Sequence, residues 1–106
     1  MSVTLFATLE VKASGVAAFT RIMGQAVPIL EEHGWKLVNA FSLRTGPLHT
    51  IIDQWELHDF NHLDSGMKAL AAHPKFPEIQ AVLQEIIIKE TLVLANKLVY
   101  PGLEGR

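Results

Sequence analysis

The chain has 106 residues, of which 49% are apolar and 19% are charged, and its formal net charge at pH 7 is -2. This length is typical of one folded domain, which we expect to span residues 1–106, and the low net charge without a Lys/Arg cluster argues against binding to nucleic acids or anionic membranes. No Cys is present, which excludes disulfides and thiolate chemistry. The sequence has no signal-peptide pattern and no run of ~18 apolar residues, so we expect a cytoplasmic protein without a membrane span.

The first part of the chain predicts a strand followed by a helix. Apolar side chains alternate over residues 3–12, which is typical of a strand with one buried face. Ser14 is placed to act as the N-cap of a helix that ends at residues 33–34, where Gly follows His. Pro28 lies inside this helix and predicts a kink.

Two further strand patterns predict a β-hairpin. They cover residues 35–44 and residues 48–57, and the turn residues Thr-Gly-Pro at positions 45–47 separate them. The two strands should therefore pair with each other in antiparallel fashion.

The second half of the chain predicts a helix in two pieces and a last strand. Asp59 occupies the N-cap position of a helix over residues 60–71, and a His-Pro step at residues 73–74 interrupts it before a second piece over residues 76–86. Residues 90–100 have the composition of a closing strand, although the apolar run before them fits either a helix or a strand. The order βαββαβ predicts an α+β, ferredoxin-like fold with a four-stranded antiparallel sheet.

Both faces of this predicted sheet carry apolar side chains. Phe6 lies between two threonines on the face opposite the better apolar face of the first strand, and Val38 and Ala40 lie opposite Leu37 and Phe41 on the second. Antiparallel sheets with one solvated face show a cleaner alternation. We therefore expect a homodimer in which the open faces of two sheets pack together.

Three stretches resemble the NIPSNAP family, which belongs to the dimeric α/β-barrel superfamily. They are GPLHTIIDQW (46–55), KALAAHPKF (68–76) and ETLVLANKLVYPGL (90–103). Trp55 and residues 74–76 carry most of this resemblance, whereas Asp53 stands where the family often has His. The resemblance implies the ferredoxin-like fold and a dimeric α/β barrel, and it implies no particular reaction, because the superfamily includes cofactor-independent monooxygenases, isomerases and other enzymes.

The third strand supplies the candidate site. Alternation places His49, Asp53 and Trp55 on one face, but His49 and Asp53 are ~13 Å apart along an extended strand, too far to form an acid-base pair. A carboxylate held partly out of water beside a Trp ring would have a raised pKa, so Asp53 is the candidate catalytic base, unless it pairs with Arg44 across the hairpin. His49, Trp55 and Asn39, which interrupts an apolar run, are the candidate ligand-binding residues.

A metal site is the weaker interpretation of the remaining polar residues. His58 and His62 are four residues apart, as zinc ligands on a helix can be, but no third ligand has a recognisable spacing. We predict no metal site and no cofactor.

The leading functional hypothesis is a NIPSNAP-like protein that binds a small apolar molecule between sheet and helices. One alternative is a cofactor-independent monooxygenase or isomerase that resembles the antibiotic-biosynthesis monooxygenases. That pattern expects an acid two residues before the Trp, which Asp53 provides, and a His near position 64, where this chain has Asp64 and, two residues earlier, His62. The other alternative is a non-catalytic dimerisation or interaction module.

Overall fold

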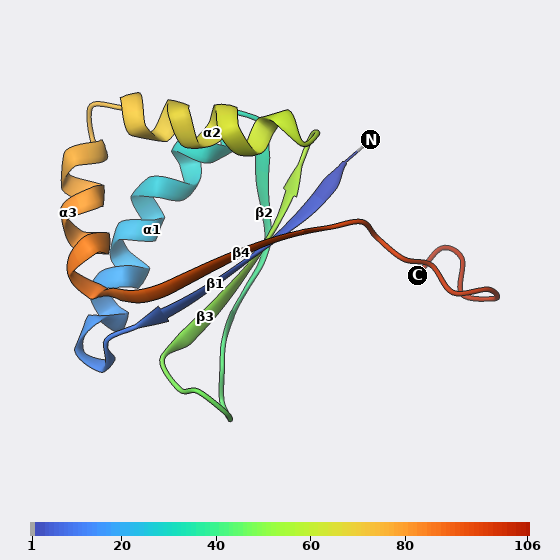
Figure 1. Ribbon diagram of the computed structural model, residues 1–106, viewed down its shortest axis with the longest axis horizontal. Helices are drawn as coiled ribbons and strands as arrows, with labels where there is room; N and C mark the ends of the chain where they lie inside the picture. Colours follow the sequence, from blue (N-terminus) through green and yellow to red (C-terminus); the bar gives the residue numbers. More distant parts are fainter. Residues whose placement is uncertain (1) are drawn as a thin grey trace.

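A four-stranded antiparallel sheet forms the centre of the computed structural model, which describes residues 2–106, and the helices cover one face of it (Figure 1). The elements are β1 (Val3–Val11), a 3-10 helix (Ala13–Gly15), α1 (Val16–Glu31), β2 (Trp35–Ser42), β3 (Thr50–Leu57), α2 (Asn61–Ala72), α3 (Phe76–Ile86) and β4 (Ile87–Ala95). The strand order is β2-β3-β1-β4, which confirms the ferredoxin-like fold. No helix among the described residues is both long enough and apolar enough to cross a membrane.

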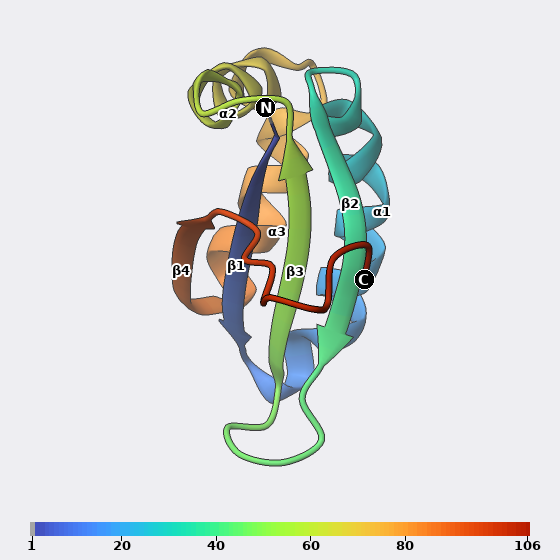
Figure 2. The ribbon, with the colours of Figure 1, turned by 90° about the vertical axis from the view of Figure 1, so that its right-hand side faces the viewer.

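The central strand β1 organises the core. Its odd-numbered side chains from Val3 to Val11 are all buried under the helices, as the alternation predicts. On the opposite face, Phe6 is 37% exposed. Figure 2 shows this open face from the front, with the helices behind the sheet.

The start of α1 differs from the prediction. Ser14 lies in the 3-10 helix that precedes α1, and Gly15 occupies the cap position without a side-chain hydrogen bond. The 3-10 turn closes through a hydrogen bond from the Gly15 N–H to the Lys12 carbonyl, so the backbone itself makes the turn that a Ser cap would have started. From Val16 the helix continues through Pro28 as far as Glu31.

Asp59 makes the hydrogen bonds expected of a helix cap. Its carboxylate accepts hydrogen bonds from the backbone N–H of Asn61 at 2.8 Å and of His62 at 3.2 Å, although α2 begins at Asn61. The His62 ring lies 2.8 Å from the same oxygen, and this hydrogen bond is the main reason why the pKa of Asp59 is lowered. Asp59 thus satisfies free backbone donors at the start of the helix.

The last strand is shifted from its predicted range of 90–100. β4 follows α3 without a loop and starts at Ile87, because β1 offers backbone partners as far as Val11, which lies opposite Ile87. It stops at Ala95, opposite Thr4, because β1 begins only one residue before Thr4, at Val3. Residues 96–106 leave the sheet and stretch away on the side of the open face (Figure 1).

Two helical glycines make a matched pair for testing the packing of α2. A Cβ on Gly66 would collide with the indole ring of Trp35 at Nε1, whereas a Cβ on Gly24 would meet no atom within 4 Å. Because Ala is favoured over Gly inside a helix, Gly24→Ala should raise the free energy of unfolding by about 0.5–1 kcal/mol. Gly66→Ala should lower it by about 1–2 kcal/mol, because Trp35 must move. Urea denaturation of both variants checks this, and equal changes would contradict the close packing of α2 on Trp35.

Candidate functional site

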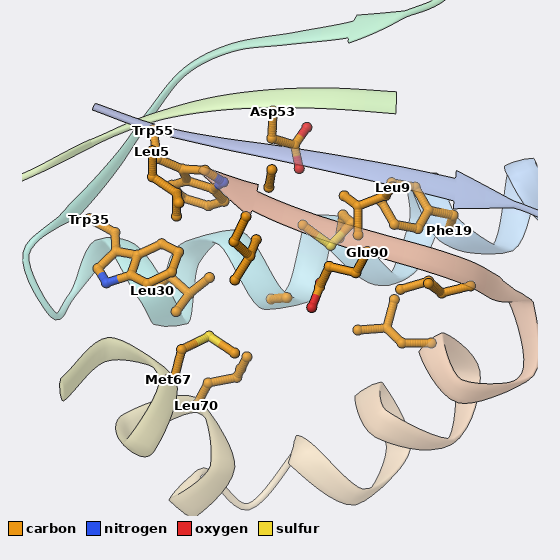
Figure 3. A pocket seen from close by; sticks show the side chains of 16 residues that line it. Leu5, Leu9, Phe19, Leu30, Trp35, Asp53, Trp55, Met67, Leu70 and Glu90 are labelled. Carbon is orange, nitrogen blue, oxygen red and sulfur yellow. The ribbon is translucent and has the colours of Figure 1, made fainter. Parts of the chain in front are cut away.

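A cavity lies between the helix-covered face of the sheet and the three α-helices (Figure 3). Its position follows from the strand register, because Asp53 of β3 is flanked by Ala7 of β1 and Ala40 of β2. These small neighbours leave space above the carboxyl group. The cavity has a volume of about 100 Å³, and all but two of its lining side chains, Asp53 and Glu90, are apolar.

A second hollow adjoins the cavity on the side of β2. It has a volume of about 230 Å³ and lies between α1 and the strands β2 and β3. Phe19, Met23 and Asp53 line both spaces. Asp53 therefore stands where the two spaces meet.

The carboxyl group of Asp53 is buried without a partner. The residue is 4% exposed, and within residues 2–106 no group donates a hydrogen bond to it or forms an ion pair with it. Arg44, the alternative partner, lies exposed in the connection between β2 and β3. Burial alone raises the pKa of Asp53 from 3.8 to about 6.

Two tryptophans form the end of the cavity near α2. Trp55 is 2% exposed and lines the cavity with Asp53, as the alternation along β3 predicts. Its ring meets that of Trp35 edge to face, with 5.2 Å between the ring centroids. The Trp35 indole N–H donates a hydrogen bond to the backbone carbonyl of His62. This bond fixes one wall of the cavity against the start of α2.

The predicted placement of His49 in the site is wrong. β3 begins at Thr50, and His49 lies in the preceding connection, where it is exposed and has a φ of 62°. Strand alternation does not extend to a residue in the left-handed region, so the side chain of His49 does not join that of Asp53.

Asn39, another candidate ligand-binding residue, also lies away from the cavity, because β2 contains a bulge. Leu37 pairs with Trp55 and Asn39 pairs with Gln54, so Val38 has no partner of its own. The extra residue moves Asn39 to the open face, where its side chain donates a hydrogen bond to that of Gln54 at 3.0 Å. Asn39 and Asp53 thus lie on opposite faces of the sheet.

Glu90 is a cavity residue that the sequence analysis missed. It lies opposite Leu9 on β4, and its exposed side chain runs from the strand toward the space between sheet and helices (Figure 3). Alternation along the strand places Glu90 on the same face as Leu92 and Leu94, and this pattern is the feature of the sequence that indicates its position.

The two histidines near α2 lie outside the cavity. The rings of His58 and His62 are 5.4 Å apart and line a shallow depression with Gly34. In the described part of the chain, no three His, Cys, Asp or Glu side chains group in a way that could hold a metal ion. His62 bonds to Asp59, so it does not supply the second polar group that the monooxygenase pattern expects near Asp53.

Comparisons with known proteins identify the fold. No protein-family model matches the sequence, and no curated protein matches it. A NIPSNAP family protein of unknown function from Agrobacterium tumefaciens superposes with a TM-score of 0.80 and 16% identity over 96% of this chain and 93% of that one. An uncharacterised NIPSNAP domain protein from Burkholderia xenovorans superposes with a TM-score of 0.78 and 17% identity, over 92% of this chain and 96% of that one.

An enzyme is also similar in structure. SnoaB, a cofactor-independent oxygenase from Streptomyces nogalater, has a TM-score of 0.72 and 13% identity over 95% of this chain and 97% of that one. Identities this low establish the fold rather than the activity. The expected likeness to NIPSNAP proteins is confirmed at the level of the fold, and the chain has the ferredoxin-like architecture that these proteins share with cofactor-independent oxygenases.

Proposed function

We propose that the protein binds a small, largely apolar molecule between its sheet and its helices, with Asp53 orienting the ligand. The observation that carries this proposal is the carboxyl group of Asp53, which is 4% exposed and unpaired at the junction of two apolar spaces. Burying a carboxyl group without a partner costs stability, and such costs are concentrated at functional sites. The volumes of about 100 and 230 Å³ bracket the ~150 Å³ of a cavity that holds benzene.

The chain's own tryptophans can report binding. The protein contains two Trp residues, and both line the cavity. We expect a small uncharged aromatic such as benzyl alcohol to shift the NMR signals of both indole N–H groups. At 100 times its dissociation constant, it should add ~2.7 kcal/mol to the free energy of unfolding.

A matched pair of variants separates binding in the cavity from binding elsewhere. Ala7→Leu fills the space beside Asp53, whereas Ala17→Leu adds the same atoms on the exposed side of α1. The ligand effect should disappear in the first variant and persist in the second. Ala40→Leu, which fills the adjoining hollow, serves if Ala7→Leu does not fold. No effect of any uncharged fragment on wild type would overturn the proposal and favour a non-catalytic interaction module.

Catalysis is the second candidate function. A carboxyl group with a pKa of about 6 is mainly ionised at neutral pH and is basic enough to accept a proton from a bound molecule. Asp53 would then be the base of a cofactor-independent oxygenase or isomerase, and a ligand bound in the apolar cavity would displace the water that can reach Asp53. Unchanged turnover by Asp53→Asn on an identified substrate would remove it from that role.

We further propose a homodimer formed through the open sheet face, in the cytoplasm, a reducing compartment that suits a chain without Cys. Phe6 is 37% exposed on this face and pairs with Val93, which is 50% exposed. The tail that follows β4 adds Leu98 and Tyr100, which are 71% and 62% exposed. Two-fold pairing would cover these apolar surfaces on both copies.

The dimer can be tested with two phenylalanines. Phe6→Lys places a charge on the open face, and Phe60→Lys makes the same change at a 58% exposed residue between β3 and α2. We expect Phe6→Lys to raise the dimer dissociation constant at least tenfold and Phe60→Lys to leave it unchanged, as measured by sedimentation. Circular dichroism checks that the variants are folded. A wild-type protein that is monomeric at high concentration would contradict the proposal.

A further inference from the structure

We propose that the cavity selects ligands that are uncharged or positively charged and that carry a hydrogen-bond donor, and that it rejects carboxylates and other anions. This inference rests on the proposed function, because it assigns a chemical class to the molecule held between sheet and helices.

The first argument is the sign of the charges. Among the described residues that line the cavity or the adjoining hollow, the ionisable ones are Asp53 and Glu90, and both are acidic. Within residues 2–106, no Lys, Arg or His side chain lines either space. An anion that entered would therefore lose its water of hydration without gaining a cationic partner.

The second argument is the position of the two carboxyl groups. Asp53 lies opposite Ala7 and Glu90 lies opposite Leu9, so their Cα atoms are separated by two strand spacings and one two-residue step, or about 12 Å. Asp53 is buried inside the cavity, whereas Glu90 is exposed at its rim near Met67 and Leu92, which are 42% and 41% exposed. A ligand would pass one carboxyl group at the rim and meet the other inside.

The charge at the rim is not compensated nearby. Lys89 precedes Glu90 but points to the other face, where it lies opposite Glu10. Lys12 forms its ion pair with Glu85 at 3.4 Å. Among the described residues, Glu90 has no ion-pair partner, so its charge acts on whatever enters.

The third argument is the hydrogen-bonding capacity of Asp53. An ionised carboxylate only accepts hydrogen bonds, and here no described residue donates one to it. A ligand hydroxyl or ammonium group would supply the missing donor, whereas a ligand carboxylate would add a second acceptor. The same group that lacks a partner in the protein thus defines what the ligand must carry.

Benzyl alcohol, benzylammonium and benzoate test this selection, since they share one ring and differ in charge. We expect benzyl alcohol and benzylammonium to bind wild type at least tenfold more tightly than benzoate at pH 7.5, as measured by titrating the two indole N–H signals. In the double variant with Asp53→Asn and Glu90→Gln, the ratio of benzylammonium to benzoate affinity should fall toward one. Glu78→Gln on α3, which removes an exposed charge away from the cavity, should leave the ratio unchanged.

The outcomes separate this inference from the function on which it rests. Benzoate binding to wild type as tightly as the other two compounds, or a ratio that survives in the double variant, would overturn the selection. Failure of all three compounds to bind wild type and the double variant would instead overturn ligand binding in the cavity.

Discussion

Replacing Trp55 with Ala is expected to lower the free energy of unfolding by about 4 kcal/mol. Trp55 is 2% exposed and is among the largest fully buried side chains of the described chain. Its removal would take away the edge-to-face contact with Trp35 and leave a void at the end of the existing cavity. Because small domains are stable by only 5–15 kcal/mol, this loss would be a large part of the total.

Urea denaturation followed by circular dichroism measures the effect of this substitution. Trp55→Phe keeps an aromatic ring, so its loss in free energy of unfolding should be less than half that of Trp55→Ala. Its unfolding transition in urea should remain measurable even if Trp55→Ala does not fold. Phe60→Ala, at a residue between β3 and α2 that is 58% exposed and lies away from the open face, should change stability by less than about 0.5 kcal/mol. A loss below about 1 kcal/mol for Trp55→Ala would mean that the two tryptophans do not form the end of a packed core.

The central strands were predictable from the sequence because their environment is uniform. β1 and β3 lie between two neighbours, so the alternation of apolar residues fixes which side faces the helices. Alternation of side chains every two residues therefore predicts the buried face of β1. It also predicts that Asp53 and Trp55 lie together on the helix-covered face of β3.

The edges of the sheet were not predictable in the same way. Because of the bulge at Val38, the side chains of β2 that follow it point to the opposite face from the one that simple alternation predicts. No residue type in that stretch marks where the extra residue is inserted. The left-handed conformation of His49 ends the alternation one residue before β3. The range of β4 depends on where β1 offers backbone partners, which is a property of the neighbouring strand and not of residues 87–100.

The cavity itself could be anticipated only in part. Asp53 stood out as a carboxylate among apolar residues, but the space above it arises from Ala7 and Ala40 on two other strands. Neither alanine is informative until the register is known. Alternation along β4 places Glu90 on the same face as Leu92 and Leu94, but only its pairing with Leu9 brings it to the cavity.

Replacing Asp53 with Asn is expected to stabilise the protein by about 2 kcal/mol at pH 7 while weakening donor-bearing ligands. The pKa of Asp53 is raised by burial from 3.8 to about 6, so the folded state holds this proton more tightly than the unfolded state. Its contribution to stability is therefore greatest below pH 4, falls as the pH rises from about 4 to about 6, and stays low above that range. The full effect of such a shift is about 3 kcal/mol, which we reduce because water can reach the cavity.

The measurement is the difference in free energy of unfolding between wild type and Asp53→Asn from pH 4 to pH 8. This difference isolates Asp53 from groups such as Asp59, whose lowered pKa makes stability fall with decreasing pH and is present in both proteins. Asp64→Asn serves as the matched control, because Asp64 is 74% exposed in its pair with Lys68 and should give a nearly flat difference. A flat difference for Asp53→Asn as well would mean that the carboxyl group is hydrated in the folded state. Asp53 would then not be the buried polar group of the site. If the stability advantage of Asp53→Asn over wild type instead rises between pH 4 and pH 6, the protein keeps a destabilising charge where its ligand is proposed to bind.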